Sequence, residues 1–70
     1  MPNQVTLTNR EWEALHLLVE CKSNKEIASQ LTICEKTVEF HLGNIYRKIG
    51  VRTRMEAIVW VLQKQAAHKN

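Results

Sequence analysis

Apolar residues recur along this chain at intervals of three and four positions, the spacing that places side chains on one face of an α-helix. Three stretches show it: Trp12, Leu15, Leu18 and Val19; then Ile27, Ala28 and Leu31; then Val38, Leu42, Ile45 and Ile49. A fourth stretch, 57–62, consists of six consecutive apolar residues. The pattern therefore predicts an all-α fold with four helices.

Polar residues mark where helices begin. In a capping box, a hydroxyl residue and a glutamate three positions later each bond the backbone N–H of the other. Three such pairs occur: Thr8 with Glu11, Ser23 with Glu26, and Thr53 with Glu56. Gly50 suits a left-handed helix end. Together these signals predict helices over about 9–20, 24–31, 35–49 and 54–67.

The two middle helices have the lengths and the short connection of a helix-turn-helix, over about 24–43. The outer face of the helix 35–49 carries Lys36, Phe40, Gly43 and Arg47, flanked by Thr37, Glu39, Asn44 and Lys48. A mid-helix glycine costs roughly 1 kcal/mol against alanine, and an outward phenylalanine leaves apolar surface wet. A helix lying in the major groove of DNA explains both, since glycine permits close approach and phenylalanine can contact a thymine methyl. The alternative is neutral drift at Gly43 and a Phe40 that packs on a neighbouring helix.

Charge is unevenly distributed along the 70 residues, whose net charge is +3. Residues 1–35 carry three lysines and arginines against five glutamates, a net charge of −2, whereas residues 36–70 carry seven against two, a net charge of +5. A basic half beside an acidic half suits an oriented contact with a polyanion. A solvated surface with chance asymmetry would give the same numbers.

Composition narrows the possible functions. A chain of this length with 44% apolar residues forms one domain with one small core, which leaves no room for a large substrate cleft. No nucleophile–base pair is found, so we expect no enzyme and no cofactor. Two cysteines, Cys21 and Cys34, are too few for a disulfide scaffold, and together with His16 and His41 they lack the paired spacing of a zinc site. No apolar run spans a bilayer, and no signal segment begins at Met1.

The chain resembles the LuxR-type, or GerE-type, helix-turn-helix domain of bacterial transcription regulators. The matching positions are Leu7, Thr8, Arg10, Glu11, Leu15, Leu17, Leu18, the segment 23–28, Leu31, Ile33, Thr37, Val38, His41, Asn44, Ile45, Lys48, Val51, Arg54 and Ala57. The resemblance covers about residues 7–62 without insertion. It implies a single domain over 1–70, a four-helix, bundle-like fold of the tetrahelical or winged-helix-like type, whose third helix enters the major groove.

The resemblance also implies what the protein does. We expect a sequence-specific DNA-binding regulator that occupies promoter or operator DNA in the bacterial cytoplasm, associated with the nucleoid. RNA polymerase is a candidate further partner, and no membrane contact is expected. Many relatives carry a sensor or receiver domain, so this chain is either a free-standing regulator or the DNA-binding part of a longer one.

Three residues depart from the family pattern. Cys21 stands where glycine is usual, and Cys34 stands where serine or threonine usually precedes the recognition helix. Cysteine caps a helix poorly because a thiol is a weak acceptor. Glu39 replaces a usual basic residue; it repels phosphate, yet it can accept a hydrogen bond from cytosine N4. The departures predict either an unusual recognition sequence or weak DNA affinity.

Contacts with DNA sort into two classes. The candidate base-edge positions are Lys36, Glu39, Phe40 and Gly43. The candidate backbone contacts are Asn24, Lys25, Thr37, Asn44, Arg47 and Lys48. His41 is expected to be structural, and Arg54 either contacts DNA or bridges to a glutamate inside the domain.

The helix 54–67 is apolar on more than one face, which indicates more than one partner. Its core-closing residues are expected to be Ala57, Ile58, Val61 and Leu62. Met55, Val59 and Trp60 are left over, and the resemblance implies that this helix forms a two-fold homodimer with half-sites about one turn of DNA apart. A monomer with Trp60 folded over the core edge is the alternative.

A second hypothesis is a protein-interaction module of the same fold with weak or lost DNA binding. Glu39 and the surplus apolar face of the fourth helix motivate it. Unchanged DNA binding after Lys36→Ala and Lys48→Ala would favour it. A sigma-factor region-four-like domain has related helix spacing, although segments 23–28 and 37–48 are closer to the LuxR type. Redox sensing at Cys34 is only weakly motivated, since it depends on exposure and pKa.

Overall fold

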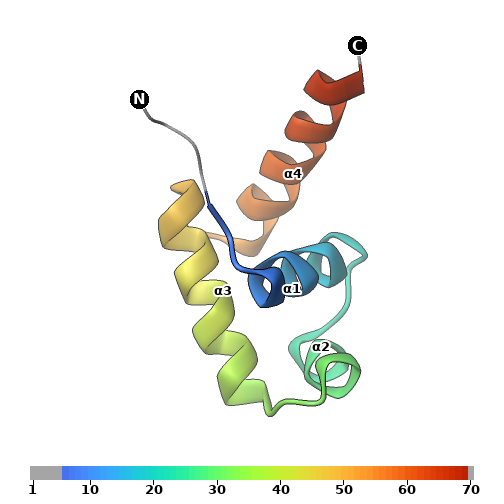
Figure 1. Cartoon of the computed structure of the whole chain (residues 1–70), viewed down its shortest axis with the longest axis vertical. Coiled ribbons are helices and arrows are strands. Elements are labelled where there is room, and N and C mark those ends of the chain that lie inside the picture. Colours follow the sequence, from blue (N-terminus) through green and yellow to red (C-terminus); the bar gives the residue numbers. More distant parts are fainter. Residues whose placement is uncertain (1–5, 70) are drawn as a thin grey trace.

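The computed structural model describes the backbone of residues 6–69 and the side chains of residues 6–64. It contains four helices, α1 (Asn9–Val19), α2 (Asn24–Leu31), α3 (Glu35–Ile49) and α4 (Arg54–Lys69) (Figure 1). The predicted all-α, four-helix fold is confirmed. α2 and α3 have the expected bounds, whereas α1 ends one residue earlier and α4 runs two residues further. Within 6–69, no helix has both the length and the hydropathy needed to cross a bilayer.

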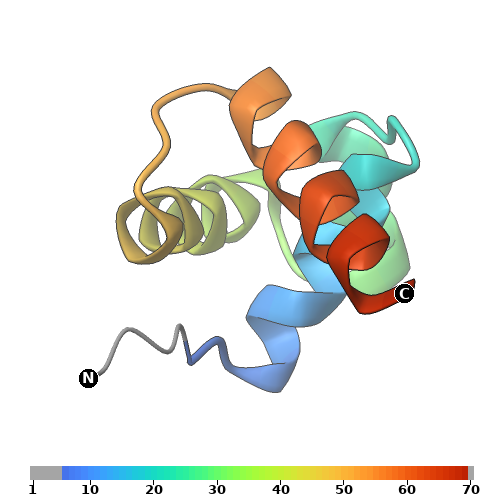
Figure 2. The same ribbon diagram turned by 90° about the horizontal axis from the view of Figure 1, so that it is seen from above.

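The helices pack around α1, which contacts each of the other three. α2 and α3 also pack on each other and form the helix-turn-helix, while α4 touches α1 and α3. α3 stands along one side of the molecule, and α4 extends beyond the rest of the bundle (Figure 1). Seen from above, α4 lies over α1, and α3 lies to one side of them (Figure 2). The outer face of α3 is therefore left uncovered by the other helices.

All three predicted capping boxes form. In each, the hydroxyl accepts from the backbone N–H of the glutamate, and the glutamate accepts from the backbone N–H of the hydroxyl residue, at 2.8–3.2 Å. Cys34, the residue before α3, provides no side-chain cap, as the weak thiol acceptor predicts. The starts of α1, α2 and α4 are thus decided by residues next to them in sequence.

The core is a single cluster of apolar side chains from all four helices and the segment before α1. Its buried members are Leu7, Ala14, Leu15, Leu18, Ile27, Ala28, Leu31, Val38, Leu42, Ile45, Ala57 and Val61. Two expectations were wrong: Trp12 is 38% exposed and Leu62 is 49% exposed. The inward stripe of α1 begins at Glu11 instead, and this turns the Trp12 ring outward against His16, with 6.0 Å between ring centroids.

Left-handed backbone ends three of the helices. Gly50 has φ 76°, as expected for a glycine after α3, but Cys21 has φ 66° and Thr32 has φ 59°. A side chain with a Cβ is strained in this region by about 1 kcal/mol or more, whereas glycine is not. The glycine position of the family pattern keeps its geometry here, although Cys21 occupies it.

Cys21→Gly is therefore expected to stabilise the fold by about 0.5–1 kcal/mol, a few degrees in the thermal midpoint. Relief of the Cβ strain outweighs the extra chain entropy of glycine in the unfolded state. Cys21→Ala is the matched control, because it removes the thiol and keeps the Cβ. Thermal denaturation followed by circular dichroism should show a gain for glycine only, and an equal gain for alanine would assign the effect to the thiol.

Candidate nucleic-acid interface

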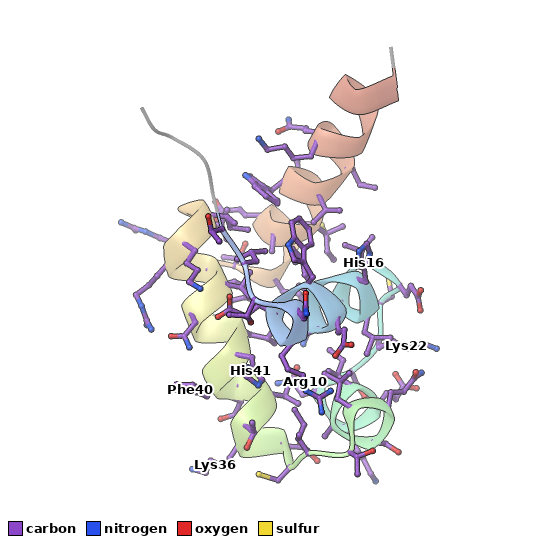
Figure 3. All side chains as sticks on the ribbon, viewed as in Figure 1. Arg10, His16, Lys22, Lys36, Phe40 and His41 are labelled. Carbon is purple, nitrogen blue, oxygen red and sulfur yellow. The ribbon has the colours of Figure 1, made fainter. Side chains whose placement is uncertain are left out.

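The outer face of α3 presents the residues that the sequence placed there. Lys36, Phe40 and Arg47 are exposed, with 65% of Phe40 accessible, and Gly43 is partly buried. Lys36 and Phe40 point away from the other helices (Figure 3). The surface combines two cations, an aromatic ring and bare backbone in one line along the helix. The alternative in which Phe40 packs on a neighbouring helix is wrong.

Gly43 has no reason inside the protein to be glycine. A Cβ built there meets only the Nη1 atom of Arg47, at 4.0 Å, which is ordinary van der Waals contact with the end of a flexible side chain. Its backbone is helical, so no left-handed conformation requires glycine either. The helix nevertheless bears the glycine penalty of roughly 1 kcal/mol. Packing within the described part of the chain therefore does not account for this glycine.

The residues flanking this line differ in how they are held. Asn44 accepts a hydrogen bond from the Arg47 guanidinium. The Thr37 hydroxyl lies 3.2 Å from the Cys34 sulfur. Glu39 makes no side-chain hydrogen bond or ion pair with the residues that the structure describes, and it is exposed. A free carboxylate therefore stands in the middle of the otherwise cationic face.

The exposed thiol of Cys34 lies at the N-terminus of α3. A hydrogen bond with the Thr37 side chain, assisted by the backbone N–H groups of Thr37 and Lys36, holds the pKa of this thiol below its ordinary value. No side-chain oxygen caps the first backbone N–H groups of α3.

Lys48 is paired within the protein, although its side chain is still 39% exposed. Its Nζ lies 2.7 Å from the Oε1 atom of Glu11, which is only 4% exposed and also accepts from the Thr8 N–H. Burial raises the pKa of Glu11, but the bonds from Lys48 and Thr8, together with the charges of Lys48 and His41, outweigh it and leave that pKa below its usual value. The pair joins α1 to α3 across 37 positions of sequence. Lys48, expected among the phosphate contacts, is engaged within the protein.

Arg54 also bonds within the domain, though not to a glutamate as one expectation had it. Its Nη1 donates to the Lys22 carbonyl at 3.1 Å, and its Nη2 donates to Asn24 Oδ1 at 2.5 Å. Glutamate is not its partner because Glu56 instead accepts from the backbone N–H groups of Arg52 and Thr53. Lys25, next to Asn24, is exposed at the start of α2.

One face of α4 carries apolar side chains that the core does not cover. Met55, Val59 and Leu62 are exposed, while Trp60 is partly buried. The Lys64 Nζ lies 5.3 Å from the centre of the Trp60 ring, a cation–π distance. Leu62 thus joins the residues that the sequence left over from core packing.

Sequence reasoning missed the long-range partners at this interface. Glu11 was explained by its capping box alone, and no local pattern links it to Lys48 or links Arg54 to Asn24. Among the described residues, no cluster of three or more His, Cys, Asp or Glu side chains is placed to hold a metal ion.

Comparison with known proteins gives consistent matches. The family model for bacterial regulatory proteins of the luxR family matches residues 5–61. The chain is 48% identical over 61 residues to the nitrate/nitrite response regulator protein NarP of Escherichia coli (strain K12). The aligned stretch covers 87% of this chain and 28% of that protein. It is 51% identical over 57 residues to the spore germination protein GerE of Bacillus subtilis (strain 168), covering 81% of this chain and 77% of that protein.

Solved structures agree with the sequence matches. The transcription factor GerE superposes with a TM-score of 0.77 at 43% identity, over 90% of this chain and 92% of that chain. The response regulator ChrA of a heme-sensing two-component system gives 0.82 at 42% identity, over 93% of this chain and 32% of that chain. The chain therefore spans less than a third of NarP and of ChrA, and most of GerE.

Proposed function

Because the chain belongs to the LuxR family of bacterial regulatory proteins, and so is a DNA-binding domain of transcription regulators rather than an enzyme, we propose that it reads specific duplex sequences with α3. In this proposal α3 lies in the major groove, and two copies pair along α4. Binding at a promoter or operator is then the whole of its activity, since occupancy requires no catalytic chemistry.

The observation that carries the proposal is the combination of Gly43 and Phe40 on the outer face of α3. The glycine is unexplained by the protein's own packing, and the ring is exposed. A major groove about 12 Å wide admits a helix whose backbone comes close, and it displays thymine methyl groups. One external partner thus accounts for two features that each destabilise the free domain.

Roles follow from the chemistry of each side chain. Phe40 suits a thymine methyl, and Glu39 suits the amino group of a cytosine. Lys36 suits guanine or a nearby phosphate, while Gly43 admits the backbone. The proposed phosphate contacts are Lys25, Asn24, Thr37, Asn44 and Arg47, while Lys48 is paired with Glu11.

Pairing along α4 is supported by its uncovered apolar face. Met55, Val59 and Leu62 expose apolar surface on a domain whose own core is small. Trp60 lies next to them in sequence and is partly buried. A second copy of this chain can cover that surface and present a second α3 to a half-site about one turn of DNA away.

Selection from a randomised duplex pool at moderate salt tests the proposal. The purified chain should enrich a motif with two-fold symmetry, and its half-site should contain cytosine or thymine at the positions nearest Glu39 and Phe40. Enrichment of a single half-site would support reading by α3 but not pairing along α4. No enrichment by a folded, helical protein would overturn the proposal. It would favour a protein-interaction module instead, which the free carboxylate of Glu39 and the apolar face of α4 also suit.

Gly43→Ala separates DNA contact from folding. Alanine should raise the free energy of unfolding by about 1 kcal/mol, because it removes the helical glycine penalty and meets no close neighbour. The same methyl group should weaken binding to the selected duplex by roughly tenfold, because it enters the closest approach of α3 to the groove. Chemical denaturation and fluorescence anisotropy measure the two effects. A variant that gains stability and binds as tightly as the wild type would show that neutral drift explains the glycine.

A further inference from the structure

The first residue of α4 is bonded to the beginning of α2, although 30 positions separate Arg54 from Asn24. The two terminal nitrogens of the Arg54 guanidinium reach two different acceptors, the backbone carbonyl of Lys22 at 3.1 Å and the Asn24 side-chain oxygen at 2.5 Å. Arg54 and Asn24 are both partly buried. The guanidinium thus holds the α1–α2 connection and the first residue of α2 against α4.

This contact decides which end of the Asn24 amide is free. Arginine carries only hydrogen-bond donors, so the Asn24 atom that faces it must be the carbonyl oxygen. The NH₂ group then lies on the other branch of the amide. It has no acceptor among residues 6–64, and it is not sealed from solvent. The bond from Arg54 therefore fixes the orientation of the Asn24 side-chain amide and leaves its NH₂ group available as a donor.

The Asn24 donor lies beside two others. Ser23 already occupies the N–H groups of Glu26 and Ile27, through its side chain and its carbonyl respectively. The backbone N–H groups of Asn24 and Lys25 have no partner inside the helix, as is usual for a first turn. In a helix-turn-helix the first helix crosses the DNA backbone, where such donors suit a phosphate oxygen.

We propose that Arg54 is a positioning residue for DNA binding, which fixes the Asn24 amide so that its NH₂ group donates to a phosphate at the start of α2. Arg54 acts through Asn24 and does not itself contact the duplex. The inference rests on the proposed function, because it requires α2 and α3 to dock on DNA. It gives α4 a second effect on binding, distinct from pairing of two copies.

A double-mutant cycle tests this arrangement. Dissociation constants for the selected duplex are measured for the wild type, Asn24→Ala, Arg54→Ala and the double variant. Arg52→Ala is the control, since Arg52 is an exposed arginine two positions away whose side chain makes no hydrogen bond or ion pair within the described part of the chain. Asn24→Ala should weaken binding about fivefold, as expected for one lost donor. Arg54→Ala should weaken binding about fivefold more than Arg52→Ala does. In the Asn24→Ala background, Arg54→Ala should cost no more than Arg52→Ala does.

Two results would overturn the proposal. If Arg54→Ala weakens binding by the same factor with and without Asn24, Arg54 touches DNA itself or acts through the fold at large. If it matches Arg52→Ala in the wild-type background, only its charge matters. Should Arg54→Ala fail to fold by circular dichroism, Arg54→Lys enters the same cycle, because a single ammonium nitrogen keeps the charge but cannot replace two separated donors.

Failure of the proposed function has a different signature. In that case the wild-type chain itself enriches no duplex from the pool. If the wild type binds and Asn24→Ala weakens it, while Arg54→Ala behaves as Arg52→Ala, the proposed function stands and only the role of Arg54 is wrong.

Discussion

Glu39→Lys is expected to tighten binding to duplex DNA of arbitrary sequence by about tenfold and to steepen the salt dependence by about one unit of log affinity per log salt. Glu39 is an exposed carboxylate on the face of α3 that carries Lys36 and Arg47. Placed near phosphates it repels them, whereas lysine attracts them and releases a counterion. Fluorescence anisotropy with an unrelated duplex at several salt concentrations measures both quantities.

The control is Glu20→Lys, which makes the same change in net charge at an exposed position after α1. It should raise affinity far less, because it does not place its charge on α3. Equal responses would mean that only net charge matters. A flat response to Glu39→Lys would contradict an α3 that faces the duplex. On the selected motif, Glu39→Lys should also lose its sequence preference at one base pair, where the cytosine amino group would donate a hydrogen bond to Glu39.

The sequence predicts the helices well because their ends depend on neighbours in the chain. The boxes begun by Thr8, Ser23 and Thr53 involve contacts three positions apart, so they can be seen without any knowledge of packing. Gly50 ends α3 for an equally local reason. The resemblance to the LuxR type adds the order of the helices and the identity of the outward face of α3.

For α1 and α4, the sequence does not fully predict how the helix is rotated about its own axis. Apolar periodicity placed Trp12 in the stripe of α1, yet Glu11 and Ala14 take the inward positions. The reason is tertiary: Glu11 finds Lys48 on α3, and a paired carboxylate can be buried where an unpaired one cannot. Leu62 is exposed for a related reason, because α4 extends beyond the bundle and its later turns have less core to cover (Figure 1).

The same limit applies to the candidate site. Residue types indicated which face of α3 is chemically suited to DNA, and that depends only on helical geometry. Which cations are free depends on distant partners. Lys48 and Arg54 look like surface charges in sequence, but Glu11 engages the first, and the Lys22 carbonyl and Asn24 engage the second. The basic half of the chain thus both ties α2 and α3 to the other two helices and presents charge on α3.

Glu11→Gln is expected to lower the free energy of unfolding by about 1–2 kcal/mol at neutral pH, a noticeable share of the stability of so small a domain. Glutamine keeps the shape and an oxygen for the Thr8 N–H, but it leaves the ammonium of Lys48 without its counter-charge. Urea denaturation gives the difference. Glu13→Gln is the matched control on the same helix, because its partner Arg10 lies 3.1 Å away with both side chains about half exposed. An exposed pair of that kind contributes about 0.5 kcal/mol or less.

The effect should depend on pH in one direction. The pKa of Glu11 is lower in the folded protein than its ordinary value of 4.5, so the folded state holds its proton less tightly than the unfolded chain does. The carboxylate therefore stabilises the fold fully above that ordinary value, and this contribution is lost as pH falls through the folded pKa. Wild type and Glu11→Gln should differ most near pH 7 and converge as pH falls below 4.5. A gap that persists in acid would mean that the charge of Glu11 is not what holds α1 to α3.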